Sequence, residues 1–370
     1  MLRVIISRSC VFAFLNDATH LTLQPVLGCL VLCRRGCPLL VATHDGSFHA
    51  DETLACAIIS YVFDNTEVIR TRDPQLLETA DIVIDVSCLN DDKHFDHHSP
   101  AFNLRRPNGI NYATAGLMWQ KFGLKYLKKI TQQYIAFPLR KDINDAVLQG
   151  ALERIDREVM YAVDLNDNGQ LNSYLRETIP VHNDGEQQIM DALNEFYRNT
   201  PDIPYLVAMQ NLPNVTGEEQ DKNFMNTVKY LKSMLINVAI NALSTEAGVL
   251  KVLALYDGGP LLIMHEKLPW TQAVLSNFDR FTDCKLAIYP DRKRGWRIQS
   301  LPYSTAERFK NKLNAPVAWR GLNDKDLDAV TGLNGTIFIH RAGFTGGALE
   351  FDTVMEMAKK WLADGEPASD

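Results

Sequence analysis

Apolar and polar residues alternate in the first third of the chain in blocks that predict strands and helices in turn. Short runs rich in β-branched residues favour buried strands at LLVAT (39–43), EVIRT (67–71) and DIVIDV (81–86). Longer, mostly apolar stretches at 52–63 and 112–122 predict helices. Strands that alternate with helices are typical of an α/β fold, so we predict a mostly parallel sheet flanked by helices.

The middle of the chain has the pattern of helices. From Ile143 to Val163 apolar residues recur every four positions, which predicts one face of a long amphipathic helix ending at DLNDNG (164–169). Residues 199–221 contain three prolines and little periodicity, so we expect a loop or linker there. A connecting helix is predicted over 222–247.

The last part of the chain predicts a second, smaller α/β domain. Five short strand candidates are KVLALY (251–256), LLIM (261–264), KLAIYP (285–290), WRIQSLP (296–302) and TIFIH (336–340). Helical stretches follow at 324–330 and 351–363. We therefore predict four parts: an extension (1–40), a catalytic domain (41–221), a connecting helix (222–247) and a C-terminal substrate-binding domain (248–370).

Composition narrows the class of protein. A formal net charge of −7 argues against a generally basic nucleic-acid coat, although DRKRGWR (291–297) is a local basic run. Seven cysteines, an odd number, do not suggest a disulfide framework. The even spacing of Cys29, Cys33 and Cys37 is compatible with a metal site, but no His or Cys partners follow nearby. No stretch reaches roughly 18 uninterrupted apolar residues, so we expect no membrane insertion.

The first forty residues differ from the rest. Arg3, Arg8, Arg34 and Arg35 stand against a single acid, Asp17, which is the composition of a mitochondrial transit segment. A secretory signal and a poorly ordered extension are the alternatives. The prediction is mitochondrial targeting, with a cytoplasmic location if the segment is not a signal.

Histidines and aspartates cluster at the ends of the predicted strands. Five of the nine histidines lie between positions 44 and 98. The candidate metal ligands are His44, His49, Asp51, Asp85, Asp96, His97, His98 and either Asp167 or Asp164. In open parallel sheets ligands bind beyond the carboxyl ends of the strands, so these residues are expected to converge at one edge.

A mixed His/Asp set without cysteine is typical of Mn²⁺, Zn²⁺ or Fe²⁺ rather than of a structural zinc cage. Seven or eight ligands are too many for one ion and fit two, with a carboxylate such as Asp85 between them. Two such ions bind a water, lower its pKa and neutralise a phosphate. We predict two divalent metal ions, with manganese favoured over magnesium, zinc or iron.

A set of motifs, in this order, makes the pattern specific. THDGSFHADETLACA, DIVIDV, FDHH, YATAGLMW, VDLNDNG and GTIFIHRAGFTGG, within residues 41–350, resemble the melanocyte-proliferating-gene exonuclease family, a branch of the DHH phosphoesterases. The resemblance implies a DHH-type fold and a metal-dependent 3′–5′ exonuclease acting on RNA in mitochondria and the nucleus or nucleolus.

The resemblance also implies roles for single residues. His44, His49 and Asp51 match the first metal-binding motif, although His49 stands where an aspartate is usual. Asp85 matches the carboxylate between the metals. Asp96 and His97 belong to the DHH motif, and His98 contacts the phosphate. The catalytic assignments are thus His98, Asp85 and Asp96, and in the fourth motif Asp167 is favoured over Asp164.

The C-terminal domain is expected to hold the substrate strand. Many DHH enzymes grip the scissile end with a GGH turn, whereas Gly346 and Gly347 are followed by no histidine here. His340 and Arg341 are candidates to replace it. The remaining candidates are Arg297 and Arg320 for phosphate contacts, and Trp296 and Trp319 for either base stacking or the core.

Three functions follow from these predictions. The first is a two-metal 3′–5′ exonuclease on single-stranded RNA. The second keeps the site but acts on short oligonucleotides or cyclic dinucleotides. The third is a metal-bearing RNA-binding regulator without turnover. The sequence leaves open a homo-oligomer.

Overall fold

The computed structural model describes residues 14–16, 20–22, 37–136, 139–178 and 181–367. Two short strands, β1 (Phe14–Asn16) and β2 (His20–Thr22), pair antiparallel. Apart from these strands and residues 37–40, the predicted transit segment, with Cys29 and Cys33 of the even cysteine spacing, lies outside the described residues.

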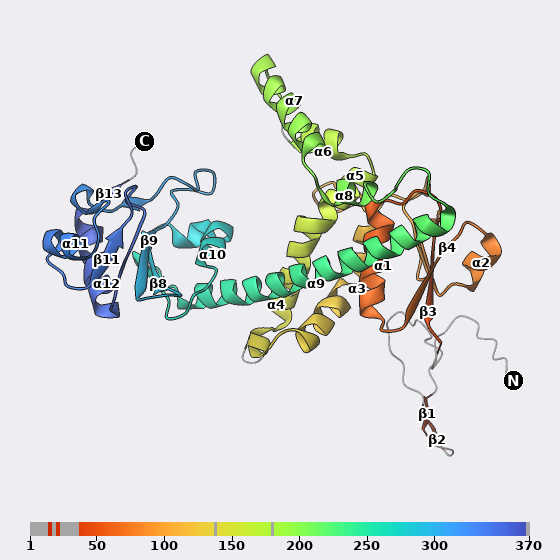
Figure 1. The fold of residues 1–370 in the computed structure, drawn as a ribbon, viewed down its shortest axis with the longest axis horizontal. Coiled ribbons are helices and arrows are strands. Elements are labelled where there is room, and N and C mark those ends of the chain that lie inside the picture. Colours follow the sequence, from red (N-terminus) through yellow and green to blue (C-terminus); the bar gives the residue numbers. More distant parts are fainter. Residues whose placement is uncertain (1–13, 17–19, 23–36, 137–138, 179–180, 368–370) are drawn as a thin grey trace. The chain divides into compact units, whose positions relative to one another are not determined.

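The chain forms two compact units, each discontinuous in sequence (Figure 1). The first comprises Met1–Gln120 and Tyr161–Leu231, and the second comprises Lys121–Met160 and Lys232–Asp370. This division differs from the limits predicted at 221/222 and 247/248, because residues 121–160 group with the C-terminal residues.

A four-stranded parallel sheet forms the centre of the first unit, in the order β4-β3-β5-β6. Its strands are β3 (Leu39–Thr43), β4 (Thr66–Arg70), β5 (Ile82–Ile84) and β6 (His94–Phe95). The apolar runs of β3 and β5 are almost fully buried, as expected for parallel strands covered on both faces. The predicted α/β fold with a mostly parallel sheet is confirmed.

Helices surround this sheet, and nearly every residue of α1 is buried. The helices that contribute to the first unit are α1 (Ala50–Val62), α2 (Pro74–Thr79), the start of α3 (Thr114–Gln133), α5 (Tyr161–Asp167), α6 (Leu171–Thr178), α7 (Asp184–Asn199), α8 (Ile203–Ala208) and the start of α9 (Gly217–Leu255). The expected loop over 199–221 is wrong in part, since it contains α8 and the first residues of α9. Asp202 starts α8 by accepting a hydrogen bond of 2.8 Å from the Tyr205 N–H.

The helix predicted over 142–163 is present but not regular. It consists of α4 (Asp145–Ile155), a π-helical turn (Asp156–Met160) and α5. An α-helix has 3.6 residues per turn, so residues spaced strictly four apart drift gradually around the helix and leave its buried face. The wider π turn absorbs the difference, so Val147 and Val163 are both buried although sixteen positions separate them.

The second unit contains a five-stranded sheet in the order β11-β12-β9-β8-β7. Its strands are β7 (Leu261–Ile263), β8 (Leu286–Pro290), β9 (Trp296–Ser300), β11 (Thr336–Ile339) and β12 (Thr345–Ala348). Only the β7–β8 pair of this sheet is parallel. A separate pair joins β10 (Leu313–Asn314) to β13 (Glu366–Pro367).

The other elements of this unit are helical. They are the end of α3, α4, the π-helical turn Asp156–Met160, the end of α9, α10 (Trp270–Ser276), α11 (Asp324–Thr331), α12 (Phe351–Asp364) and the 3₁₀ turns Leu139–Asp142, Phe278–Phe281 and Val317–Trp319. Strands and helices together confirm the α/β prediction for the C-terminal region.

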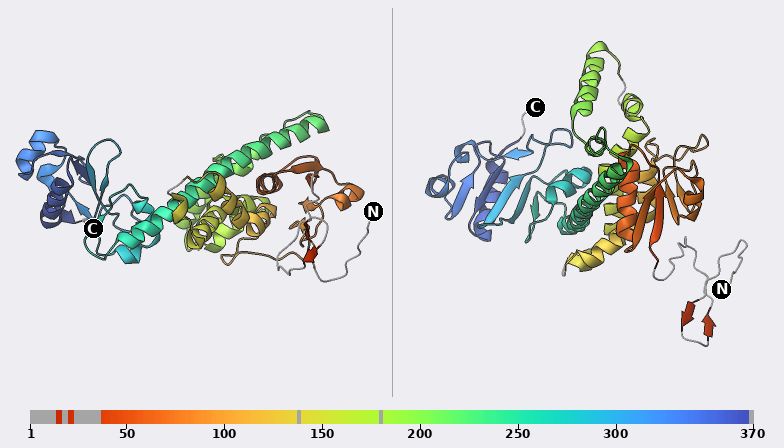
Figure 2. Two further views of the ribbon diagram at one scale, coloured as in Figure 1. Left: turned by 90° about the horizontal axis from the view of Figure 1, so that it is seen from below. Right: turned by 45° about the vertical axis from the view of Figure 1, so that its right-hand side comes forward.

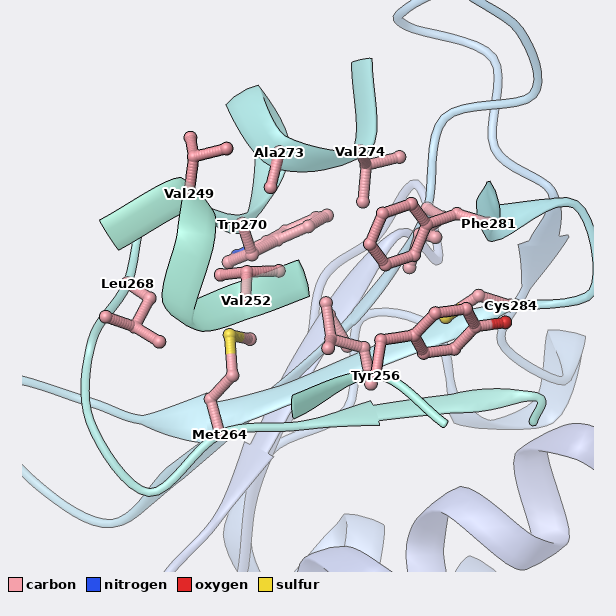
Figure 3. Close-up of a cluster of buried hydrophobic side chains, with 13 residues drawn as sticks. Val249, Val252, Tyr256, Met264, Leu268, Trp270, Ala273, Val274, Phe281 and Cys284 are labelled. Carbon is pink, nitrogen blue, oxygen red and sulfur yellow. The ribbon is translucent and has the colours of Figure 1, made fainter. Parts of the chain in front are cut away.

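Residues 251–255 of the segment KVLALY (251–256) are the end of α9 and not a strand, which corrects the prediction. Short apolar runs have no distinctive period, so helix and strand are hard to tell apart. Val249, Val252 and Tyr256 follow a helical spacing and pack against Trp270 and Phe281 in a buried cluster (Figure 3). The view in Figure 2 shows α9 as one unbroken helix.

By length and composition alone, α9 is apolar enough to cross a membrane. Buried helices of water-soluble proteins pass the same test. Leu235, Ala239 and Leu243 of α9 are almost fully buried in this chain. The helix therefore has a packing role that accounts for its apolar face.

Candidate metal centre

The predicted ligands of the first unit do converge at the carboxyl ends of its parallel strands. His44 follows β3, Asp85 follows β5, and the segment 96–98 follows β6. Helix α1 adds His49 from its N-cap and Asp51 from its first turn, and α5 adds Asp167 at its last residue. Groups of these side chains bring one ligand atom each within 4.8 Å of one another.

Asp85 is the residue on which the histidines converge. Its Oδ2 lies 3.6 Å from His44 Nε2, and its Oδ1 lies 3.6 Å from His97 Nδ1 and 3.2 Å from His98 Nδ1. Thr114 donates its hydroxyl proton to Oδ1 at 3.0 Å. The Asp85 backbone has φ of 55°, a left-handed conformation that costs a non-glycine residue about 1 kcal/mol. Strain of this kind is retained where the direction of a side chain matters.

Asp51, Glu52 and Asp85 form a buried group of three acids. Among the described residues, no hydrogen-bond donor reaches either carboxylate oxygen of Asp51 or Oε2 of Glu52. Burial raises the pKa of Asp51 well above its ordinary value, and the negative charge of Asp85 raises it further. Buried carboxylates without donors are costly unless a cation neutralises them. Together with the nearby imidazoles, they fit a divalent metal ion.

Glu52 is the residue that sequence reasoning missed. It is fully buried, its Oε1 lies 3.2 Å from His44 Nε2, and the same oxygen accepts a hydrogen bond of 2.7 Å from the His49 N–H. An acid in the first turn of a helix is usually explained by capping or by its favourable interaction with the helix dipole. For this reason Glu52 was not considered as a ligand. The usable signal was its position two residues before the apolar run LACAII (54–59).

The structure separates the two aspartates of the fourth motif. Asp167 Oδ2 lies 2.9 Å from His97 Nε2, and Asp167 belongs to a group with His49 and Asp51. Asp164 instead forms a buried ion pair with Arg106 at 2.8 Å and accepts the Gly116 N–H at 3.1 Å. Asp167 therefore joins the cluster, and Asp164 holds α3 against α5.

The residues of segment 94–98 have different environments. Asp96 is buried and uses both oxygens within its own loops, accepting the Cys88 N–H at 2.6 Å and the His98 N–H at 2.9 Å. His98 is exposed over about half of its side chain, 55%. Hydrogen bonding to Asp85, followed by Asp96, raises the pKa of His98 to about 9. His94 contacts Asp91 at 3.0 Å and lies outside the cluster.

Burial and charge also act on His44, whose Nδ1 lies 2.9 Å from the Asp45 carbonyl. Desolvation opposes its protonation, but the hydrogen bond and negative charge of Glu52 outweigh it, so the pKa of His44 is raised. Nδ1 carries the proton when it donates to a carbonyl, which leaves Nε2 as the ligand atom.

Two residues outside the motifs fix the first loop. Arg70 donates to the carbonyls of His44 at 3.2 Å and Gly46 at 2.5 Å. Asn211 forms two hydrogen bonds with the backbone of Phe48, at 2.9 Å and 2.8 Å. These are positioning residues, because they touch the backbone that carries the ligands and not the ligands' side chains.

The predicted substrate residues all lie in the second unit. Arg297 pairs with Asp291 at 2.9 Å, and Arg320 pairs with Glu366 at 2.6 Å. His340 and Arg341 are exposed just after β11. Contact of these side chains with a substrate stays a prediction.

Gly346 and Gly347 lie within strand β12 and not in a turn, which corrects the expected geometry. Strand β12 pairs with β9 and β11 on its two sides. A Cβ at Gly346 would meet Ile339 Cδ1 at 2.3 Å, and one at Gly347 would meet the Trp296 carbonyl at 2.7 Å. Close packing therefore accounts for both glycines.

The two tryptophans are packed within the second unit. Trp319 belongs to a buried cluster of this unit, which is the core interpretation. Trp296 is partly buried, with its ring 4.7 Å from that of Phe351.

Comparison with known proteins agrees with this picture. The profile MYG1_exonuc, described as an uncharacterised protein family (UPF0160), matches residues 40–362. A MYG1 protein of Schizosaccharomyces pombe is 30% identical over 338 residues, covering 87% of this chain and 97% of its own. The MYG1 exonuclease of Mus musculus is 29% identical over 346 residues, covering 88% and 85%.

Solved structures give a much weaker likeness. RecJ from Thermus thermophilus, crystallised with Mn²⁺, is 14% identical with a TM-score of 0.21, covering 89% of this chain and 53% of RecJ. That value carries no argument about fold or chemistry. The profile match and the relatives confirm the resemblance seen in the motifs: the chain belongs to the MYG1 exonuclease family.

Proposed function

We propose that the chain is a metal-dependent 3′–5′ exonuclease acting on single-stranded RNA. The observation that carries the proposal is the meeting of three buried carboxylates, two of them with oxygens lacking donors, with the histidines that follow the parallel strands. A site of this kind suits the hydrolysis of a phosphodiester. The name exonuclease carried by mammalian relatives supports a nuclease.

Each residue has a role that follows from its environment. His44, His49 and His97, with Asp51, Asp85 and Asp167, would hold two divalent ions, most readily manganese. Such ions, when bound, supply a water of lowered pKa and neutralise charge on the phosphate. Asp85 lies between His44 and His97, so it is the carboxylate placed to serve both ions.

His98 is the group for the substrate phosphate. In the metal-free chain Asp85 and Asp96 raise the pKa of His98 to about 9, and the exposure of its side chain leaves it accessible to a phosphoryl oxygen. Asp96 orients it through a contact of 2.9 Å between Oδ1 and Nδ1. A protonated donor aimed at the reacting phosphate stabilises the charge that develops there.

The test uses the purified full chain with Mn²⁺ and the same short RNA labelled at either end. A 3′–5′ exonuclease releases the 3′ label first and shortens the 5′-labelled strand in single-nucleotide steps. His98→Gln should lower the rate about a hundredfold while metal binding is retained. Absence of mononucleotide release with Mn²⁺, Mg²⁺, Zn²⁺ or Fe²⁺ overturns the proposal, and activity confined to the shortest strands assigns the site to oligonucleotides.

Location is part of the proposal. The arginines and scarcity of acids in residues 1–40 favour mitochondrial targeting. A fluorescent fusion should enter mitochondria with these residues and not without them.

A further inference from the structure

The second unit contains an open groove of about 490 Å³ to which the sequence predictions assigned no role. Its lining comes from α10, β9, the loop after β9 and the segment between β11 and β12. Phe309, Phe344, Gln299, Asn311 and Arg308 are the lining residues whose chemistry points to a ligand. All of them belong to one unit, so the groove is complete within it.

The groove offers exposed aromatic surface. Phe309 is fully exposed, whereas a large apolar side chain is usually at least partly covered. Its loop has a fixed stem, because the Tyr303 N–H donates to the Lys310 carbonyl at 2.7 Å. Phe344 is partly covered, with its ring 4.7 Å from that of His340. Aromatic side chains held beside a groove are the surfaces on which single-stranded bases stack.

Two amide side chains add a donor and an acceptor. Gln299 Oε1 accepts the Tyr289 hydroxyl at 2.8 Å, and Gln299 Nε2 has no partner among the described residues. Asn311 Nδ2 donates to Asn314 Oδ1 at 2.7 Å, and Asn311 Oδ1 has no described partner. An amide N–H and an amide oxygen beside an aromatic surface match the polar edge of a nucleobase.

The charge of the groove fits a phosphate backbone. Arg308 lines it and is exposed, and no acidic side chain is among the described lining residues. Lys310 lies on the same loop, where it pairs with the exposed Glu307 at 3.9 Å, and Arg341 directly precedes the lining residue Ala342. Basic side chains around an aromatic groove favour a polyanion over an apolar peptide.

We propose that this groove binds one base of the substrate RNA strand, with Phe309 stacking on the base and Arg308 contacting the adjacent phosphate. The inference rests on the proposed function for the identity of the strand. It adds a base-binding place built from residues of the second unit, whereas the metal ligands belong to the first.

The closing experiment measures binding separately from turnover. Fluorescence anisotropy of a labelled oligouridylate is recorded with the full chain in EDTA, which prevents hydrolysis. Phe309→Ala should weaken binding about tenfold, and Phe309→Tyr should restore it, since both rings stack. Val317→Ala, which trims another exposed apolar side chain of the same unit, should bind as the parent does. Arg308→Ala should lower the slope of log Kd against log salt concentration by about one, because one phosphate contact is lost.

Steady-state kinetics separate the two proposals. In the active enzyme Phe309→Ala should raise KM about tenfold and leave kcat unchanged. If the parent degrades RNA and Phe309→Ala changes neither Kd nor KM, the groove proposal is overturned and the nuclease stands. If the parent shows no nuclease activity, the proposed function fails, and the anisotropy series alone decides whether the groove binds a base.

Discussion

Two carboxylates, one from each unit, have opposite environments. Asp51 in the first unit is buried without a hydrogen-bond donor, and burial next to Asp85 raises its pKa. Asp328 in the second unit accepts hydrogen bonds from the Thr336 hydroxyl at 2.6 Å, the Thr336 N–H at 2.9 Å and the Gly335 N–H at 3.2 Å. These bonds lower its pKa. A carboxylate that accepts hydrogen bonds, like that of Asp328, stabilises the fold by itself. A buried carboxylate without hydrogen-bond donors, like that of Asp51, needs a cation to neutralise its charge.

The backbone shows the same contrast. In the first unit a non-glycine residue, Asp85, adopts φ of 55° beside the cluster. In the turn that follows Asp328 the left-handed positions are glycines, with φ of 70° at Gly332 and 83° at Gly335, although Asp324 at the start of the same helix has φ of 43°. Glycine adopts this conformation without a steric penalty. The backbone at Asp85 therefore carries a steric cost that the turn at Gly332 and Gly335 does not.

The largest expected effect comes from Asp85→Asn. It keeps the size of the side chain and removes the charge on which three histidines converge. Metal-dependent release of nucleotides should fall at least about a hundredfold, since even residues that only orient metal ligands contribute ten- to a hundredfold. Asp45→Asn is the matched control, because the exposed Asp45 side chain pairs with Arg72 on the surface of the same region, and the substitution leaves its backbone carbonyl in place. Equal rates for the two variants would remove Asp85 from the mechanism.

Glu52→Gln tests whether the acid missed in the sequence belongs to the centre. Glutamine keeps the hydrogen bond to the His49 N–H and removes the charge 3.2 Å from His44. Affinity for Mn²⁺, measured by calorimetry, should fall about ten- to a hundredfold. Glu67→Gln, at an exposed position of β4, should bind Mn²⁺ as the parent does. An unchanged affinity in Glu52→Gln would assign Glu52 to helix capping alone.

Residues that directly follow a strand could be predicted from the sequence, whereas residues placed by tertiary packing could not. Strands β3 and β5 are continuous apolar runs, and ligands directly after parallel strands converge by topology, so His44 and Asp85 were accessible to pattern reasoning. The role of Glu52 could not be predicted in this way, because its burial depends on how α1 packs. The groove of the second unit could not be predicted either, because its residues come from separate segments and only the folded chain brings Phe309 near Phe344.

Local sequence patterns also gave wrong predictions where the same pattern is compatible with two kinds of secondary structure. Residues 251–256 read as a strand because a short apolar run carries no clear period, and packing of Val252 and Tyr256 decides for a helix. The glycines at 346 and 347 read as a turn, yet neighbouring strands leave no room for a side chain there. In both cases tertiary contacts, absent from a local window, select the structure.

Asp51→Asn should separate stability from metal binding. Removing a buried carboxyl that has no donor and lies beside Asp85 should stabilise the metal-free protein by about 1 kcal/mol. The stabilisation that Mn²⁺ gives the parent should be largely lost, since that gain depends on affinity. Thermal unfolding with and without Mn²⁺ measures both. A metal-free variant less stable than the parent would contradict the view of Asp51 as an acid held for a cation.

Asp328→Asn is the counterpart in the second unit, with the smallest expected effect. A folded-state pKa below the ordinary value of 3.8 contributes stability that is present above that value and is lost as pH falls through the folded pKa. Asparagine keeps a hydrogen-bond acceptor but no charge, so the variant should be less stable at neutral pH by about 1 kcal/mol or less. The difference from the parent should shrink below about pH 4, since the parent's carboxyl is then protonated too. Unfolding by denaturant at a series of pH values checks this, and a gap that widens with acid would mean that Asp328 acts through its shape and not through its charge.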